Sequence, residues 1–414
     1  MRILWVKGGK LLPADTGGKI RSYNILRHLA RHHQVTLLSY YGGSRDTDYE
    51  ARIRSSLPGT ETIHTAAPEK FLAQSFDYML SLPAKAPYAV TKFTHPAVQR
   101  TVKHWLSEQR FEVAVCDFLS ASLNFPDKLQ VPCLLFQHNV ETVLWQRLAK
   151  VELMPVKRLS YRIEASKMAR YEPQALRKFH HVIAVSNYDR DEMRKLDSNC
   201  PITVVPTGVD TEHYAVAPPA LAIPPLVVFT GSMDWEPNID AVEYFCGEIW
   251  PQVLAALPQA RFQIVGRNPH RRLQRLASSS VELTGTVPSV ASYLRDATVV
   301  VVPLRVGSGT RLKIFEAMAM GKALVSTSIG AEGLNVKNGR DLILADDAAA
   351  FSNAIVNLLC DSDLRRRYEQ AAALQAKQYD WSRIAECFTA VMQETITGFH
   401  AAKKRVPLPA RVNP

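Results

Sequence analysis

The sequence predicts an α/β protein of two doubly wound domains, each built on a parallel β-sheet with helices on both faces. Short runs of apolar, often β-branched residues, such as those at 226–230 and 299–302, alternate with longer segments whose apolar residues recur at helical spacing. Residues 206–225 are rich in proline and lack a periodic pattern, as a boundary between domains does. A chain of 414 residues is long enough to give each domain its own core.

The first domain is predicted to open with a strand at 2–6 and a helix over about 20–31, which the pair Gly17 and Gly18 precedes. Further strands are expected at 34–40, 61–65, 112–116, 131–136, 181–185 and 202–205. The carboxyl ends of parallel strands are where ligands bind in such sheets, and His138 follows one of them. On this pattern alone, His138 is either a site residue or a loop histidine that caps the next helix.

Residues 142–178 form a long, strongly basic stretch that predicts two helices divided near Pro155. Apolar and basic residues share this stretch in a way that is compatible with a membrane-facing surface. Solvated faces on helices that pack against the sheet explain it at least as well. Ser186 is expected to cap the helix that follows the strand at 181–185.

The second domain is predicted to contain strands at 226–230, 261–265, 281–283, 299–302, 323–326 and 342–344. Two helices, at 348–359 and 363–375, follow the last strand. A final helix over about 382–398 is then followed by a basic tail at 399–414, which we expect to be mobile.

The segment 299–326 carries the strongest chemical signal. Its helix, expected over 312–320, begins just after a loop with two glycines, so unpaired backbone N–H groups face whatever lies beyond the preceding strand. Arg311 and Lys313 fall in the first turn, where the helix dipole favours acidic residues, and a bound phosphate would explain two cations there. Glu316, one turn later, suits a ribose diol because a carboxylate accepts both hydroxyl hydrogens. The alternative is a helix that opens with ordinary solvated charges.

The composition is that of a globular protein with an anionic partner. Apolar residues make up 47% of the chain, and the formal net charge is +11. Nucleotide sugars, anionic lipid headgroups and nucleic acid would all suit this charge. Because the basic residues are spread over many predicted helices, without zinc-finger spacing or an RNA-recognition signature, no nucleic acid is expected.

The cysteines and the hydropathy of the chain indicate where in the cell the protein is expected. The six cysteines lie far apart without a CxxC pair, so they read as reduced thiols. The start MRILWVKGG lacks the apolar region of a signal peptide, and no run approaches the length of a membrane span. We expect a cytoplasmic protein, with peripheral contact at the cytoplasmic face of the membrane as an open alternative.

The run GSGTRLKIFEAMAMGKALVSTSIGAEGL at residues 307–334 resembles the donor-nucleotide signature of GT-B glycosyltransferases, in particular the large retaining family 4. In that family two glutamates precede Ala-Met-Ala, and the second one grips the donor ribose; it matches Glu316. The first glutamate falls at Ser308. The chain departs from the family pattern at this position, which is expected to contact the donor sugar.

A second departure concerns the phosphates. Most family members carry an Arg and a Lys in the loop after the strand at 226–230, and both grip the diphosphate. This chain has Gly231 and Ser232 at the start of that loop but neither cation. We infer that Arg311 and Lys313, from the neighbouring loop, replace the pair. Cations bind a phosphate equally well from different positions in the sequence.

The resemblance implies a GT-B fold, in which two Rossmann-like domains face each other across a cleft. The acceptor-side domain would span 1–212, with the final helix returning to it, and the nucleotide-sugar donor domain would span 213–381. His138 would be the catalytic residue: it would lie near the anomeric carbon of the donor sugar, position that sugar and accept a hydrogen bond from it. The other implied site residues contact the donor phosphates or the base: Gly17, Gly18, Gly309 and Thr310 with Arg311 and Lys313 for the phosphates, and Thr286 and Val287 for the base.

The expected reaction is transfer of a sugar from a nucleotide diphosphate sugar to an acceptor hydroxyl. The resemblance implies retention of configuration, a role in polysaccharide or glycoconjugate synthesis, and a saccharide or lipid-linked saccharide as acceptor. No cofactor and no metal are expected, because the triplets Asp189-x-Asp191 and Asp361-x-Asp363 begin predicted helices, where the helix dipole explains acidic residues. A nucleotide-sugar epimerase of the same fold and a non-catalytic basic scaffold that binds nucleic acid or membrane remain as alternatives.

Overall fold

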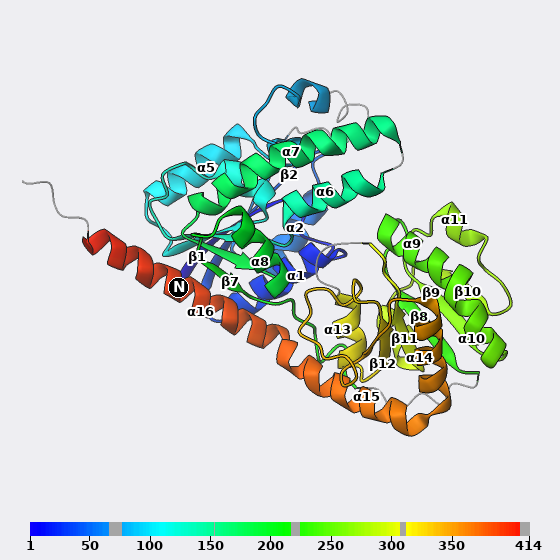
Figure 1. Cartoon of the computed structure of the whole chain (residues 1–414). Coiled ribbons are helices and arrows are strands. Elements are labelled where there is room, and N and C mark those ends of the chain that lie inside the picture. The colour runs from blue at the N-terminus through cyan, green and yellow to red at the C-terminus, as the bar shows by residue number, and fades with distance from the viewer. Residues whose placement is uncertain (66–76, 153, 217–223, 307–311, 406–414) are drawn as a thin grey trace, which may run out of the picture. The chain divides into compact units, whose positions relative to one another are not determined.

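The computed structural model describes residues 1–65, 77–152, 154–216, 224–306 and 312–405. It divides into two compact units, each with its own parallel sheet (Figure 1). Unit 1 comprises Met1–Pro206 and the chain from Ile384 onward, and unit 2 comprises Thr207–Arg383. The α/β class and the two Rossmann-like sheets expected from the sequence are therefore confirmed.

Unit 1 contains a sheet of seven parallel strands in the order β3-β2-β1-β4-β5-β6-β7. The strands are β1 (Arg2–Gly8), β2 (Gln34–Tyr41), β3 (Thr60–His64), β4 (Val113–Asp117), β5 (Cys133–Phe136), β6 (His181–Ala184) and β7 (Ile202–Val204). The chain order reverses direction between β1 and β4, which makes the carboxyl ends of these two strands the switch point of the sheet.

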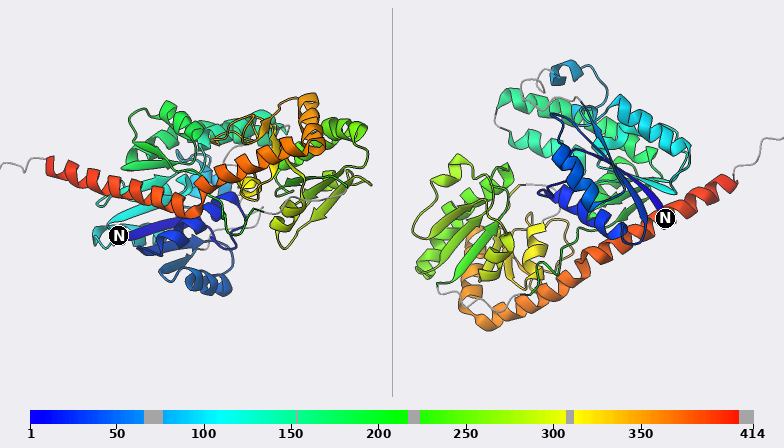
Figure 2. Two further views of the ribbon diagram at one scale, coloured as in Figure 1. Left: turned by 90° about the horizontal axis from the view of Figure 1, so that it is seen from below. Right: turned by 180° about the vertical axis from the view of Figure 1, so that it is seen from behind.

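Helices cover both faces of this sheet (Figure 2). Leu4 and Val6 of β1 belong to a core cluster with residues of α5 and with Met168 of α7. Trp5, which points to the opposite face, packs against Phe388 of the final helix with 5.2 Å between ring centroids. The helices are α1 (Gly17–Leu29), α2 (Thr47–Ser56), α4 (Tyr88–Thr91), α5 (Pro96–Ser107), the 3₁₀ helix η1 (Leu119–Asn124), α6 (Glu141–Val151), α7 (Pro155–Lys178) and α8 (Asn187–Leu196).

Unit 2 contains six parallel strands in the order β10-β9-β8-β11-β12-β13. They are β8 (Leu226–Thr230), β9 (Arg261–Val265), β10 (Val281–Gly285), β11 (Val299–Val302), β12 (Ala323–Ser326) and β13 (Ile343–Leu344). The helical segments are α9 (Glu236–Tyr244), the π-helical turn η2 (Phe245–Ile249), α10 (Trp250–Ala256), α11 (Arg271–Gln274), α12 (Val290–Asp296), α13 (Leu312–Ala319), α14 (Ala348–Cys360), α15 (Ser362–Ala376) and η3 (Lys377–Tyr379).

The chain leaves unit 1 between Pro206 and Thr207, before the expected break near residue 212. Hydrogen bonds tie this segment to the end of unit 2, since Val209 N donates to Tyr379 O at 2.7 Å. Gly208 is needed here, because a Cβ atom would lie 2.5 Å from the Trp381 ring. The crossing segment therefore packs with unit 2.

The final helix, α16 (Trp381–Arg405), extends past the predicted end at residue 398. The prediction that the basic tail begins at 399 was wrong, because residues 401–405 read Ala-Ala-Lys-Lys-Arg and all favour helix; Pro407 follows soon after. The rest of the tail, 406–414, lies outside the described residues. In the part of the chain that the structure describes, no helix is long and apolar enough to cross a membrane.

Candidate active site

The carboxyl ends of the central strands of unit 1 hold a buried cluster of polar side chains. Lys7 lies in β1, Asp117 ends β4, and His138 follows β5. Arg21 reaches the cluster from the second turn of α1. All four side chains are buried. The fold brings them together because β1, β4 and β5 are neighbours in the sheet and all end at the same edge.

Hydrogen bonds fix the protonation state of His138. Its Nε2 lies 2.7 Å from Asp117 Oδ1, and its Nδ1 lies 2.7 Å from Arg21 Nη1. Because a guanidinium group only donates, Nδ1 must be the acceptor, and the single ring proton is on Nε2. Burial lowers the pKa of His138 to about 3, so the ring is neutral. Both ring nitrogens are thus engaged within the protein, and neither is open to a sugar hydroxyl in this arrangement.

Asp117 is the anion at the centre of the cluster. Burial alone would raise the pKa of its carboxyl, but the Lys7 ammonium and His138 outweigh burial and hold the pKa well below its usual range. Lys7 Nζ lies 3.2 Å from Asp117 Oδ2, and Trp5 Nε1 donates to the same oxygen at 2.9 Å. Asp117 therefore compensates a buried cation and orients His138 at the same time.

Gly18 and Phe118 form the wall of this cluster. The Phe118 ring stacks on His138 with 3.7 Å between centroids, and the backbone at Phe118 has a φ of +72°. A Cβ atom on Gly18 would lie 2.4 Å from Phe118 Cζ. The first turn of α1, which contains Gly17 and Gly18, approaches the ring this closely only because Gly18 has no side chain.

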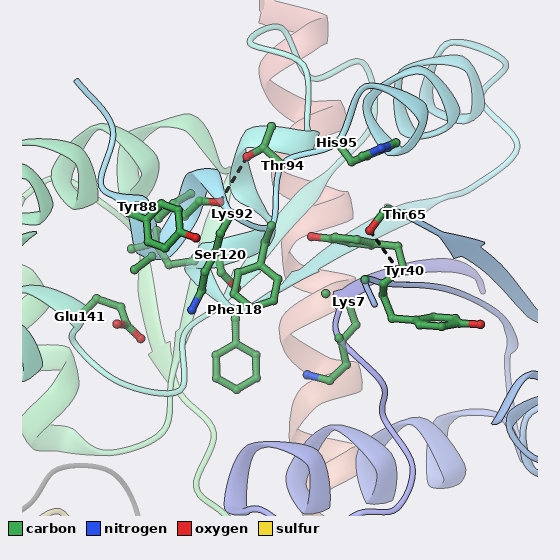
Figure 3. Close-up of a pocket in the computed structure, with 18 of the residues that line it drawn as sticks. Lys7, Tyr40, Thr65, Tyr88, Lys92, Thr94, His95, Phe118, Ser120 and Glu141 are labelled. Atoms are coloured by element: carbon green, nitrogen blue, oxygen red, sulfur yellow. Dashed lines mark hydrogen bonds between the residues drawn. The ribbon is translucent and has the colours of Figure 1, made fainter. Parts of the chain in front are cut away.

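A pocket of about 670 Å³ in unit 1 borders the cluster (Figure 3). Its walls combine aromatic rings with charged groups, the mixture that saccharides bind through stacking and hydrogen bonds. Figure 3 shows that Lys92 and Glu141 enter this space from different elements. The aromatic lining residues are Tyr40, Tyr41, Tyr88, Phe93, Phe118 and Trp145, and the charged ones include Lys7, Lys10, Lys19, Lys92, Asp77 and Glu141.

Glu141, the first residue of α6, is one of the carboxyl groups that line this pocket. Burial, followed by the charge of Glu172, raises the pKa of Glu141 to about 7. Glu172 itself is buried in α7, and its carboxylate accepts hydrogen bonds from the backbone N–H groups of Glu141, at 3.0 Å, and Thr142, at 2.8 Å. These bonds hold the N-terminus of α6 and thereby fix the position of the Glu141 side chain.

We expect Glu141→Gln to change how stability depends on pH. The pKa of Glu141 is about 7 in the folded chain against an ordinary 4.5, so the folded state holds the extra proton between these values. The contribution of Glu141 to stability is complete below pH 4.5 and is lost as the pH rises through 7, at about 1.4 kcal/mol per pH unit at most. We expect the free energy of unfolding of the wild type to fall by about 2 kcal/mol more than that of the variant between pH 5 and pH 8, which urea unfolding at the two pH values would measure.

The exposed Glu108→Gln is the matched control for this experiment, and it should follow the wild type at both pH values. An equal response of the two variants would contradict a special role of Glu141.

In unit 2 the carboxyl ends of β8 and β9 approach each other closely. A Cβ atom on Gly266 would lie 1.6 Å from Gly231 O, so only glycine fits after β9. Arg267 follows, and its Nε donates to Ser232 Oγ at 3.3 Å. This contact brings a cation to the loop that begins with Gly231 and Ser232, in which the sequence alone offers none.

Lys313 of α13 lies beside the same loop. Its Nζ donates to Asn238 Oδ1 at 3.0 Å and lies 4.1 Å from the centroid of the Phe229 ring. A Cβ atom on Gly231 would lie 2.9 Å from this Nζ. The structure thus brings Lys313 and Gly231 together, as the replacement of the missing cations requires.

Glu316 lies one turn further along α13 and is partly buried. Burial raises the pKa of Glu316, against a hydrogen bond from Tyr214 and the charge of Lys313. At the outer edge of the sheet, Thr286 and Val287 follow β10; the first is exposed and the second partly buried. Four further predicted site residues lie outside the described residues: Ser308, Gly309, Thr310 and Arg311.

Both Asp-x-Asp triplets have structural partners. Asp189 lies in the first turn of α8, where its carboxylate accepts from Ser186 Oγ. Asp361 caps α15 and accepts from Asp363 N at 3.0 Å and Leu364 N at 2.8 Å. Within the described ranges, no group of three or more His, Cys, Asp or Glu side chains is arranged to hold a metal. That the protein needs no metal stays a prediction.

Several residues of these sites were not identified from the sequence. Asp117 directly follows the strand predicted at 112–116, and Arg21 and Glu172 lie in segments predicted to be helical, with no local signal of a role in a site. Asn238 and Arg267 were also missed. Each belongs to the site through a contact with a residue distant in the chain, and no local spacing signals such a contact.

Two family models match the chain. The model for "Glycosyltransferase Family 4" matches residues 16–213, and the model for "Glycosyl transferases group 1" matches residues 224–361. Among curated proteins, the phosphatidyl-myo-inositol mannosyltransferase of Mycobacterium leprae is 31% identical over 232 residues. This match covers 52% of the chain and 59% of the relative.

Solved structures share the fold over nearly the whole chain. The sucrose-phosphate synthase of Thermosynechococcus elongatus aligns with a TM-score of 0.71 at 16% identity, covering 96% of this chain and 100% of that one. The HepE protein of Anabaena, solved with UDP and glucose, aligns with a TM-score of 0.61 at 14% identity, covering 95% and 99% of the two chains.

Proposed function

The chain belongs to the family 4-like glycosyltransferases of GT-B fold, and we propose that its donor is a nucleoside diphosphate sugar, which it transfers to a saccharide or lipid-linked saccharide. The observation that carries this proposal is the contact of Lys313 with the loop at Gly231, next to Asn238. An ammonium group at the carboxyl end of β8 is suited to a diphosphate. The proposal favours transfer over epimerisation because both family models describe transferases.

In the proposed donor complex, Lys313 and Arg267 face the diphosphate and stabilise the negative charge that develops as it leaves. Glu316 accepts hydrogen bonds from the ribose hydroxyls through its carboxylate oxygens. Thr286 and Val287 flank the base. We assign Gly309, Thr310 and Arg311 to the phosphates and Ser308 to the donor sugar from the sequence motif.

His138 acts in this proposal as a positioning residue. Because Asp117 and Arg21 occupy its two ring nitrogens, the neutral imidazole does not transfer a proton in this proposal. It holds the Phe118 ring in place by stacking on it. A mechanism without a basic histidine fits transfer with retention, in which the leaving phosphate can accept the proton of the acceptor hydroxyl. Gly17 and Gly18, at the first turn of α1, stay assigned to the donor phosphates.

The pocket of unit 1 is the proposed acceptor site. Tyr40, Phe118 and Trp145 offer ring faces to a sugar, and Lys92 and Glu141 offer hydrogen bonds. Among the residues that the structure describes, the Lys92 amino group has no ion-pair partner and lies 5.1 Å from the centroid of the Phe93 ring. It is therefore available to an oxygen of the acceptor. A role in polysaccharide or glycoconjugate synthesis is part of the same proposal.

Nucleotide binding tests the proposal directly. We expect one nucleoside diphosphate, and the sugars attached to it, to raise the melting temperature of the purified protein by several degrees, because a ligand that binds only the folded state stabilises it. A fluorescence melting scan against UDP, GDP, ADP, TDP and their sugars would identify the base.

The same shift in the presence of EDTA is the expected result if no metal takes part. A shift that EDTA abolishes would contradict metal independence, and the absence of a shift with every nucleotide would contradict the donor site.

A further inference from the structure

Exposed apolar side chains gather at one place on unit 1. In the described part of the chain, large apolar side chains are exposed mostly in two segments, residues 79–82 and 154–159, which we call the apolar tip. Val156 is 81% exposed and Met79 is 66% exposed, values that are unusual for residues of their type. The side chains of the tip are Met79, Leu80, Leu82, Met154, Val156 and Leu159.

The two segments form one surface. Residues 77–81 are helical, and they lie against α7, where the Tyr78 hydroxyl donates to Ser160 O at 3.4 Å. Lys167 Nζ donates to Ser81 O at 3.0 Å. The second segment is the start of α7, next to the connection from α6 (Figure 1). The two segments of the tip are therefore neighbours that hydrogen bonds hold together.

A basic groove lies beside the tip, between α6 and α7. It has a volume of about 440 Å³ and is lined by Gln146, Ala149, Lys150, Arg158, Arg162 and Ala165. Three of these side chains are cationic and none is acidic. Arg158 Nε donates to the backbone oxygen of Glu152 at 2.7 Å, and among the described residues no carboxylate forms an ion pair with Lys150, Arg158 or Arg162.

We propose that the apolar tip docks on a membrane surface that contains anionic phospholipids, with a headgroup phosphate in the basic groove. Two guanidinium groups and an ammonium group suit the oxygens of a phosphate. Apolar side chains beside cations are the combination that binds to the interface of an anionic membrane. A second copy of the chain is a poor occupant, because a symmetric contact would bring the same cations together.

The tip also borders the pocket of unit 1. Asp77 and Tyr88 line that pocket, and Met79 follows Asp77 closely in the chain. The Tyr78 ring, between them, contacts the Tyr88 ring edge-on at 5.4 Å. If the pocket is the acceptor site, which rests on the proposed function, the tip holds that site at the membrane surface, where a lipid-linked acceptor would present its sugar.

Vesicle binding by the full-length chain tests this proposal. We expect the wild type to sediment with vesicles of phosphatidylcholine and phosphatidylglycerol and to bind pure phosphatidylcholine vesicles much more weakly. The triple variant Lys150→Gln, Arg158→Gln, Arg162→Gln should lose about 100-fold in affinity, at roughly fivefold per cation near an anionic surface. The triple variant Met154→Gln, Val156→Ser, Leu159→Gln should lose at least tenfold at high salt, where the apolar contribution dominates.

Matched controls come from unit 2. Arg366→Gln with Arg367→Gln removes exposed cations, and Leu374→Gln removes a side chain that is 67% exposed. These controls should keep wild-type binding, and all variants should keep the wild-type melting temperature and nucleotide-induced shift, which separates membrane docking from donor binding. No binding of the wild type to anionic vesicles, or equal losses in the controls, would overturn the proposal. A dimer that the tip variants dissociate would also overturn it.

Discussion

Replacing Lys313 by methionine is expected to lower turnover by about 100- to 1000-fold, the usual effect of removing one preorganised group that stabilises developing charge. The Lys313 ammonium lies at the carboxyl end of β8, beside Gly231 and bonded to Asn238 at 3.0 Å. Because methionine keeps much of the volume and loses the charge, the fold should survive. Steady-state kinetics with the donor that the melting scan identifies would measure the effect.

Two further variants make this experiment specific. Lys313→Arg keeps a cation at the site and should recover part of the lost turnover, although a guanidinium group has a different shape. Lys377→Met removes an exposed lysine elsewhere in unit 2 and should leave turnover unchanged. Near-normal turnover of Lys313→Met, in a protein that still binds the nucleotide, would show that Lys313 is not part of the phosphate clamp.

The strands of unit 2 were predicted most accurately. β8, β9, β11 and β12 have the bounds that the apolar runs indicated. A strand buried on both faces is a nearly continuous apolar run, so its ends are visible in the sequence. Helix α2 (Thr47–Ser56), whose residues are mostly polar, was not predicted, because a helix with a narrow apolar face gives a weak periodic signal.

The site was predicted only in part, for a related reason. The motif around Lys313 and Glu316 is local, so a resemblance over a few residues was enough to predict a site there. The partners of His138 are not local, because Arg21 is 117 positions away from it along the chain. The order of strands in the sheet creates that contact, and the sequence pattern does not specify which helix residue reaches the strand ends.

The second large effect concerns Asp117. We expect Asp117→Asn to reduce the free energy of unfolding by about 3–5 kcal/mol, because it removes the anion that compensates the buried Lys7 ammonium at 3.2 Å. Asparagine still offers an oxygen to His138 Nε2–H, so the ring should keep its place. Urea unfolding at pH 7 measures the loss. The control is Glu112→Gln, which changes an exposed carboxylate just before the start of β4. It should lower the free energy of unfolding by less than about 1 kcal/mol.

The pH dependence of this loss identifies its cause. The pKa of Asp117 is lower in the folded chain than its ordinary value of 3.8, so its charge contributes stability above pH 3.8 and loses that contribution as the pH falls through the folded-state pKa. The difference in the free energy of unfolding between the wild type and Asp117→Asn should therefore be constant from pH 8 to pH 5 and shrink below pH 4. Folded His138 has a pKa of about 3, so its ring stays neutral above about pH 4 in both proteins, and the loss of stability that it causes as the pH falls below 6.5 cancels in the difference over that range. A gap that stays constant down to pH 3 would mean that shape, not charge, makes Asp117 necessary.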